Sequence, residues 1–206
     1  MKRIAVLAPT ALAVALAVAA CGSGSKAASP TPGPASSVGA AAPGATSAPE
    51  VSAAGDIPDN QAFVAYAPPA GGFSVKVPEG WARTESGGVV TFTDKLNSIR
   101  IQSQPAPSAP TVASAQQGEV PAISAMSAHY QPGKVTAITR NAGPAVLITY
   151  QADSAADRVT TKVVALDVER YEFWRNGTEV VLTLSAPHGA DNVDPWRTVT
   201  DSFGWK

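Results

Sequence analysis

Residues 160–187 read TTKVVALDVERYEFWRNGTEVVLTLSAP. Two extended runs rich in apolar and β-branched side chains flank Asn176-Gly177, the dipeptide best suited to a type I′ turn because both residues tolerate a positive φ. The segment therefore predicts a long β-hairpin. In the first strand, the apolar residues of the alternating pattern shift by one position between Val168 and Tyr171. We therefore expect a bulge or a strand break near Glu169-Arg170 that accommodates one extra residue.

Earlier in the chain, three further segments alternate apolar and polar residues with the period of a strand that has one buried face. The first is residues 73–77, which Pro78 ends, and a turn then brings Trp81 back toward the core. The other two contain Val90 with Phe92 and Ile99 with Ile101. The pattern predicts adjacent strands of one antiparallel meander.

A Pro-rich break at residues 105–110 precedes a predicted helix over residues 111–130, which Thr111 could cap. Its expected apolar stripe is Val120, Ile123, Met126, Ser127 and Tyr130. Pro121 predicts a kink or a late start of this helix, because proline lacks the N–H that a helix interior requires. Two more strands are expected at residues 135–140 and 145–150.

Near the C-terminus, Asp194-Pro195 predicts an N-cap followed by proline in the first turn of a helix. Trp196, Val199, Thr200 and Phe203 then lie on one stripe. The order of elements predicts an α+β domain in which an antiparallel sheet is flanked by helices, an α/β/α sandwich.

The N-terminal segment has the anatomy of a signal peptide, with positive Lys2 and Arg3 before an apolar run over residues 4–18. This run is shorter than the roughly 20 apolar residues of a membrane-spanning helix. Residues 18–21, Val-Ala-Ala-Cys, resemble the lipobox of bacterial lipoproteins, which implies cleavage before Cys21 and attachment of diacylglycerol to its sulfur. A plain secretory peptide followed by a free thiol is the alternative.

Three segments follow from this pattern. We expect a lipoprotein signal peptide at residues 1–20, a disordered linker of Ala, Pro, Gly and Ser at residues 21–60, and one folded domain at residues 61–206. A flexible linker of this length would span roughly 35 Å on average, so it would hold the domain clear of the lipid headgroups. The chain is expected on the extracytoplasmic face of the cell membrane, anchored by lipid on Cys21.

The segment at residues 72–81, the hairpin strand at residues 180–187 and the closing segment at residues 196–203 resemble the PsbP-like fold, which includes actinobacterial lipoproteins of the LpqN type. The resemblance covers about residues 63–206. It implies a non-catalytic accessory or binding protein of the cell envelope, and it supplies no active site. A high content of Ala, Pro and Gly with few Lys also suggests a GC-rich bacterial genome.

The charge of the chain argues against nucleic acid as a partner. Loss of a segment that holds Lys2 and Arg3 leaves a net charge of −3 in place of −1. A mildly acidic protein lacks the basic surface that neutralises phosphates. The same charge argues against binding to a membrane through a polybasic patch.

No catalytic residue, metal site or cofactor is expected. The chain has two histidines, and His129 is expected to complement a helix dipole. His188, Asp191 and Asp194 match no established zinc or calcium spacing. Asp167 and Glu169 share one face of a strand, which we interpret as a solvated edge. A histidine deep in a pocket beside a carboxylate would instead indicate an enzyme.

Without a catalytic or metal site, we expect a surface or groove that recognises another molecule. Trp174 and Arg175 flank the hairpin turn, and an exposed tryptophan beside an arginine is typical of an interface hot spot. A neighbouring loop that covers Trp174 is the alternative. A hydrophobic groove between the sheet and a helix is another. The sequence thus leaves three hypotheses: a tethered module that binds an envelope protein or lipid component, an envelope enzyme, or a carrier of a small apolar ligand.

Overall fold

The computed structural model describes residues 55–206. The predicted signal peptide, Cys21 and most of the predicted linker lie outside these residues. Among the helices of the described part, none is long and apolar enough to cross a membrane. The first core residue is Ile57, which is buried among the side chains of the main core.

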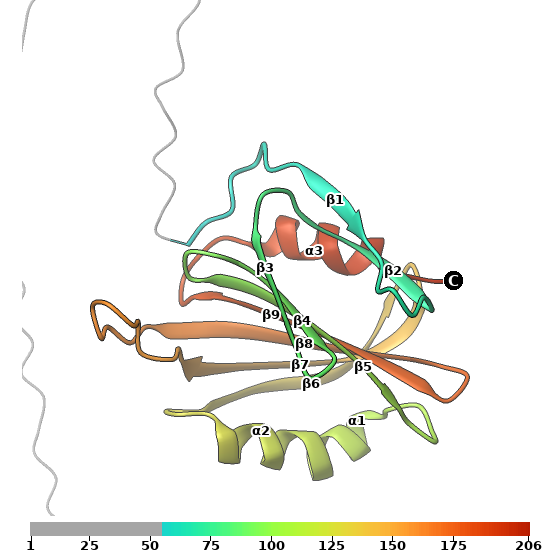
Figure 1. Cartoon of the computed structure of the whole chain (residues 1–206). Helices are drawn as coiled ribbons and strands as arrows, with labels where there is room; N and C mark the ends of the chain where they lie inside the picture. Colours follow the sequence, from blue (N-terminus) through green and yellow to red (C-terminus); the bar gives the residue numbers. More distant parts are fainter. Residues whose placement is uncertain (1–54) are drawn as a thin grey trace, which may run out of the picture. The chain divides into compact units, whose positions relative to one another are not determined.

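One antiparallel sheet of seven strands forms the middle layer of the domain (Figure 1). In order across the sheet, the strands are β3 (Ala82–Ser86), β4 (Val89–Asp94), β5 (Asn97–Pro105), β9 (Thr178–Pro187), β8 (Ala165–Arg175), β7 (Gly143–Asp153) and β6 (Gln131–Arg140). The predicted hairpin is confirmed as β8 and β9, and Asn176 and Gly177 at its turn both have a positive φ.

A second, smaller sheet lies beside the large one. It has the order β1 (Phe63–Tyr66), β2 (Phe73–Pro78) and β10 (Gly204–Trp205). The expected single meander is therefore wrong in part, because residues 73–78 pair with β1 and β10 while β4 and β5 pair in the large sheet. Strand β3 was not predicted, since all of its side chains are exposed and it carries no apolar alternation.

Helix α3 (Val193–Ser202) and the β1–β2 hairpin cover one face of the large sheet, here called the α3 face (Figure 1). The predicted stripe of α3 is confirmed, because Trp196, Val199, Thr200 and Phe203 are all buried. Phe203 stacks on Phe173 of β8 with ring centroids 4.3 Å apart. The main hydrophobic core lies here, between α3, β2 and the sheet.

The opposite face, here called the α2 face, is covered by α1 (Val112–Ser114), the π-helical segment η1 (Ala115–Glu119) and α2 (Val120–Met126). Thr111 caps α1 as predicted, since its hydroxyl accepts a hydrogen bond from the Ser114 N–H. The irregularity expected at Pro121 takes the form of η1, where the Val120 N–H donates to the Ala115 carbonyl five residues earlier.

The apolar cluster on the α2 face is small, with Ala115, Ile123, Val146 and Ile148 at its centre. The predicted helical stripe is only partly correct. Ile123 is buried, but Met126 is 81% exposed because the helix ends there, four residues before Tyr130. Arg170 of β8 links the two layers: it donates to Glu119 of η1 at 2.7 Å and to buried Glu172 at 3.0 Å.

Two other predictions are corrected. Strand β8 pairs in unbroken register with both neighbours, so there is no bulge at Glu169-Arg170. The N-cap of α3 is Asn192 and not Asp194; its side chain accepts from the Ile57 N–H and donates to the Gly55 carbonyl, and so fastens the N-terminal segment. The α+β class, a large antiparallel sheet with helices on both faces, is confirmed.

Candidate functional site

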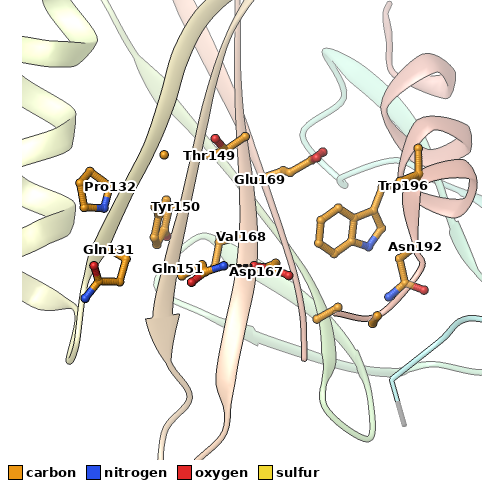
Figure 2. A pocket seen from close by; sticks show the side chains of 14 residues that line it. Gln131, Pro132, Thr149, Tyr150, Gln151, Asp167, Val168, Glu169, Asn192 and Trp196 are labelled. Atoms are coloured by element: carbon orange, nitrogen blue, oxygen red, sulfur yellow. Dashed lines mark hydrogen bonds between the residues drawn. The ribbon is translucent and has the colours of Figure 1, made fainter. Parts of the chain in front are cut away.

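A cavity of about 480 Å³ lies between the N-terminal end of α3 and the β6–β7–β8 side of the sheet (Figure 2). It opens on the α3 face, beyond the end of the main core. The residues that line it come from β6, β7, β8, β9, the loop after β9 and α3. Its lining includes Thr149, Gln151, Asp167, Glu169, Ala186, Ala190, Asn192 and Trp196.

The continuous strand β8 explains why two carboxylates face this cavity. Asp167, Glu169, Tyr171 and Phe173 alternate onto the same face of an unbroken strand. Tyr171 and Phe173 are buried in the main core, whereas Asp167 and Glu169 extend along the strand toward Trp196 (Figure 2). The interpretation of this carboxylate pair as a solvated edge is wrong, because β8 lies between β9 and β7.

Asp167 holds the loop that follows β9. Its carboxylate lies 3.0 Å from His188 Nδ1 and accepts hydrogen bonds from the Gly189 N–H at 3.1 Å and the Gln151 amide at 2.9 Å. Partial burial acts to raise the pKa of Asp167, but these hydrogen bonds outweigh it and hold the pKa below its ordinary value. Asp167 is therefore an anion whose acceptor sites are largely occupied by the protein.

The carboxylate of Glu169 has fewer hydrogen-bond partners than that of Asp167. Its Oε2 accepts a hydrogen bond from the Tyr171 hydroxyl at 2.5 Å, and Arg140 donates to that hydroxyl at 3.2 Å. Burial raises the pKa of Tyr171 to about 12, and the hydrogen bond and negative charge of Glu169 add to the effect. Tyr171 thus remains a neutral donor, and the charge of Glu169 meets no ion-pair partner within residues 55–206.

Trp196 forms the wall opposite the carboxylates. Its side chain is 7% exposed. A buried indole N–H usually has an acceptor, yet that of Trp196 has none in the described part of the chain. Its nitrogen is also absent from the fully buried, unpaired atoms, so it keeps some exposure to solvent. The wall of the cavity therefore includes a tryptophan whose indole N–H has no acceptor among residues 55–206.

The floor of the cavity is fixed by an irregularity in β6. The register of β6 and β7 shifts between Pro132 and Val135, and the Lys134 N–H donates to the Thr149 hydroxyl at 2.9 Å. At Gly133, an added Cβ would lie 2.3 Å from the Thr149 carbonyl oxygen. Only glycine allows this close approach, which holds Thr149 in position.

The two histidines lie outside this cavity lining. His188 contacts Asp167, but its side chain is 59% exposed; His129 contacts Asp153 and is 83% exposed. Neither contacts a hydroxyl group among residues 55–206. The same residues contain no group of three His, Cys, Asp or Glu that could hold a metal ion. Asp191 and Asp194 do not join His188 in a ligand set.

Trp174 and Arg175, the expected recognition surface, lie at the far end of β8. The Trp174 indole N–H donates to the Ala106 carbonyl at 2.9 Å, so the loop after β5 partly covers the ring. Arg175 is exposed and lines a separate hollow with Trp205 and Lys206. The sequence placed the two residues together at the turn, but it missed the cavity, which forms only where α3 meets the sheet.

Comparisons with known proteins show the fold. No family model and no curated protein matches the sequence. The solution structure of cyanobacterial PsbP (CyanoP) from Synechocystis sp. PCC 6803 is similar over 76% of this chain and 99% of that one, with 16% identity and a TM-score of 0.51. The domain therefore has a PsbP-like fold, as the sequence resemblance predicted.

Two weaker similarities are also found. The Saccharomyces cerevisiae Ran-binding protein Mog1p matches with 10% identity over 70% of this chain and 95% of that one, at a TM-score of 0.45. A protein from Bacteroides thetaiotaomicron matches with 12% identity over 69% of this chain, at a TM-score of 0.47. This chain spans about half of the Bacteroides protein, 48% of its length.

Proposed function

We propose that this chain is a lipid-anchored, extracytoplasmic binding module of a bacterial cell envelope, of the LpqN type, whose head binds its ligand in the cavity beside α3. One observation carries the proposal for the head: a cavity of about 480 Å³ that the protein's own side chains leave unfilled. Ligand sites usually enclose about 300–1,000 Å³ and combine apolar walls with a few polar groups.

The lining of this cavity supports binding over catalysis. It has an indole donor and a carboxylate with a single protein partner, which suit recognition of a polar molecule. The two histidines, which are the usual bases at neutral pH, are mostly exposed and contact no hydroxyl within residues 55–206. A nucleophile activated by a neighbouring base would need such a contact.

The tether rests on the sequence around Cys21. Cys21→Ser should leave the precursor without lipid, because the sulfur that receives diacylglycerol is gone. We expect the variant to lose incorporation of an alkyne-labelled fatty acid and to leave the membrane fraction. Ser23→Ala is the control and should behave as the natural chain. Normal fatty-acid labelling or membrane retention of Cys21→Ser would contradict the anchor.

The head can be tested with a photocrosslinking amino acid in intact cells. Val193, at the cavity mouth, and Met126, on the α2 face, are matched positions because both are exposed apolar side chains, at 71% and 81%. We expect Val193 to give a defined envelope component that an excess of unlabelled head displaces, and Met126 to give none. Equal capture at both positions would contradict a specific site at the cavity.

A carrier of a small apolar ligand is the second candidate, and a different cavity favours it. About 310 Å³ lies beneath the β1–β2 hairpin, lined mainly by apolar side chains that include Tyr66, Phe73, Val90 and Ile101. Native mass spectrometry of the purified chain should then show a bound apolar molecule that Val90→Trp excludes. A chain free of any such mass would contradict the carrier.

A further inference from the structure

The charge around the cavity beside α3 restricts the ligands that it can accept. Its lining contains the carboxylates Asp167 and Glu169 and no lysine, arginine or histidine. An anionic ligand would approach two negative charges with no compensating group in the lining. Because electrostatic interactions strengthen where water is partly excluded, this arrangement favours a ligand that carries a positive charge.

Glu169 is the carboxylate available to that charge. Asp167 is surrounded by His188, Gly189 and Gln151, whereas Glu169 has the neutral Tyr171 hydroxyl as its one hydrogen-bond partner in the described chain. The Arg140 guanidinium donates to this hydroxyl and pairs with Asp201 at 3.5 Å, but it forms no ion pair with Glu169. Glu169 therefore presents a half-buried negative charge that has no direct ion-pair partner among residues 55–206.

Trp196 supplies a second, independent indication of a ligand. Its ring is more than nine-tenths buried, and its indole N–H is without an acceptor among residues 55–206. A ligand in the cavity with a hydrogen-bond acceptor could pair with this donor, which is otherwise left without a protein partner. The aromatic ring would in addition attract a cation placed over it. The site thus combines one anion, one donor and one aromatic wall.

The same lining argues against a bare metal ion. Calcium takes six to eight oxygen ligands, and the described residues offer no cluster of three metal-binding side chains. The volume is also that of an organic molecule. The cation is therefore part of a larger compound that also carries a hydrogen-bond acceptor.

We propose that the cavity beside α3 binds a small organic ammonium compound that bears an uncharged hydrogen-bond acceptor, with the ammonium group at Glu169 and the acceptor at the Trp196 indole N–H. This inference rests on the proposed function and names the ligand class of the same site. It is independent of Trp174 and Arg175, which lie at the other end of β8.

Isothermal titration calorimetry on the purified full chain tests the ligand class with two probes of almost the same shape. Choline carries a quaternary ammonium group and a hydroxyl, and 3,3-dimethylbutan-1-ol replaces the charged nitrogen with carbon. We expect choline to bind at least tenfold more tightly than the neutral alcohol. We expect its affinity to fall as the salt concentration rises, because the interaction is between charges.

Matched variants locate the charge. Glu169→Gln keeps an acceptor for the Tyr171 hydroxyl and should weaken choline binding at least tenfold. Glu79→Gln, an exposed side chain outside the cavity, should leave it unchanged. An unchanged thermal unfolding midpoint for Glu169→Gln would show that the loss is not a folding defect.

Two results would overturn the ligand class. Equal affinity of choline and the neutral alcohol would show that charge is not recognised, and an unchanged affinity in Glu169→Gln would place the cation elsewhere. Absence of choline binding would also overturn it. None of these results decides the proposed function, since crosslinking at Val193 and labelling at Cys21 test the tethered binding module without any assumption about charge.

Discussion

The two faces of the large sheet differ in the hydrogen-bond and ion-pair partners of their tryptophan and glutamate side chains. On the α2 face, Arg170 lies between Glu119 and Glu172, and the Trp174 indole N–H donates to Ala106. At the cavity end of the α3 face, Glu169 has no ion-pair partner and the Trp196 indole N–H has no acceptor in the described chain. Both faces carry a tryptophan and a glutamate, so residue type does not distinguish them.

The difference arises from which segments of the chain cover each face and offer hydrogen-bond partners there. The loop after β5 and the segment η1 cover the α2 face and accept hydrogen bonds from Trp174 and Arg170, although Glu172 Oε2 is buried there without a hydrogen-bond partner among residues 55–206. On the α3 face, α3 begins at Val193 and covers the sheet beside β8 only in part, so a cavity remains at its N-terminal end. We infer that the α2 face serves mainly to stabilise the domain, whereas the α3 face serves both stability and binding.

The largest effect should come from truncation of the main core. Phe173→Ala removes a side chain with 0% exposure that stacks on Phe203, and we expect a loss of about 3–5 kcal/mol in the free energy of unfolding. Ile123→Ala, in the smaller cluster of the α2 face, should cost about 2 kcal/mol. Urea unfolding followed by circular dichroism measures both. A larger loss for Ile123→Ala would reverse our ranking of the two faces.

Two glycine substitutions should change the stability of the domain by smaller amounts and in opposite directions. Gly133→Ala would bring a Cβ to 2.3 Å from the Thr149 carbonyl, and we expect it to destabilise the domain by about 1–3 kcal/mol. Gly118→Ala, in η1 on the α2 face, meets no atom within 4 Å and should stabilise by about 0.5–1 kcal/mol. Thermal unfolding of the two variants compares them. Equal midpoints would contradict the close approach at Gly133.

The two faces should also respond to pH in opposite directions. Burial raises the pKa of Glu172 above its ordinary value of 4.5, although the charge and hydrogen bond of Arg170 act to lower it. The folded state then binds a proton that the unfolded state has released, so this site gains stability as the pH falls from neutral toward 4.5. The stability of the natural chain relative to Glu172→Gln should therefore rise as the pH falls over that range.

The contribution of Asp167 to stability should depend on pH in the opposite direction. Hydrogen bonds from His188, Gly189 and Gln151 hold its pKa below 3.8, against the effect of burial. Its stabilisation is present above 3.8 and is lost as the pH falls through the folded-state pKa. The stability difference between the natural chain and Asp167→Asn should therefore narrow below 3.8. Parallel pH profiles for Asp167→Asn and Glu172→Gln would contradict the opposite assignments.

The sequence predicted the fold better than the site, for physical reasons. Asn176-Gly177 determines a turn locally, and the stripe from Trp196 to Phe203 follows helical geometry, so both were predictable. The role of Asp167 and Glu169 was not, because their alternation is the same at an exposed edge and in a central strand beside a cavity. Their position depends on β7 and β9 as neighbours and on the point at which α3 begins.

The apparent change of apolar phase in β8 also depends on neighbouring elements that the sequence of the strand alone does not reveal. Val168 is buried and alternates to the face opposite Tyr171 and Phe173, which pack in the main core. The strand is therefore apolar on one side at one end and on the other side at the other end. With a single buried face, this pattern would require a bulge. A strand covered on both faces needs none.

The most direct test of the account compares the two tryptophans in one spectrum. With the indole nitrogens of the full chain labelled with ¹⁵N, choline is added and the N–H resonances of Trp196 and Trp174 are followed, each assigned by its Phe variant. We expect a saturable shift of the Trp196 resonance, at the cavity on the α3 face, and a constant Trp174 resonance. An unmoved Trp196 resonance, or an equal shift of Trp174, would contradict it.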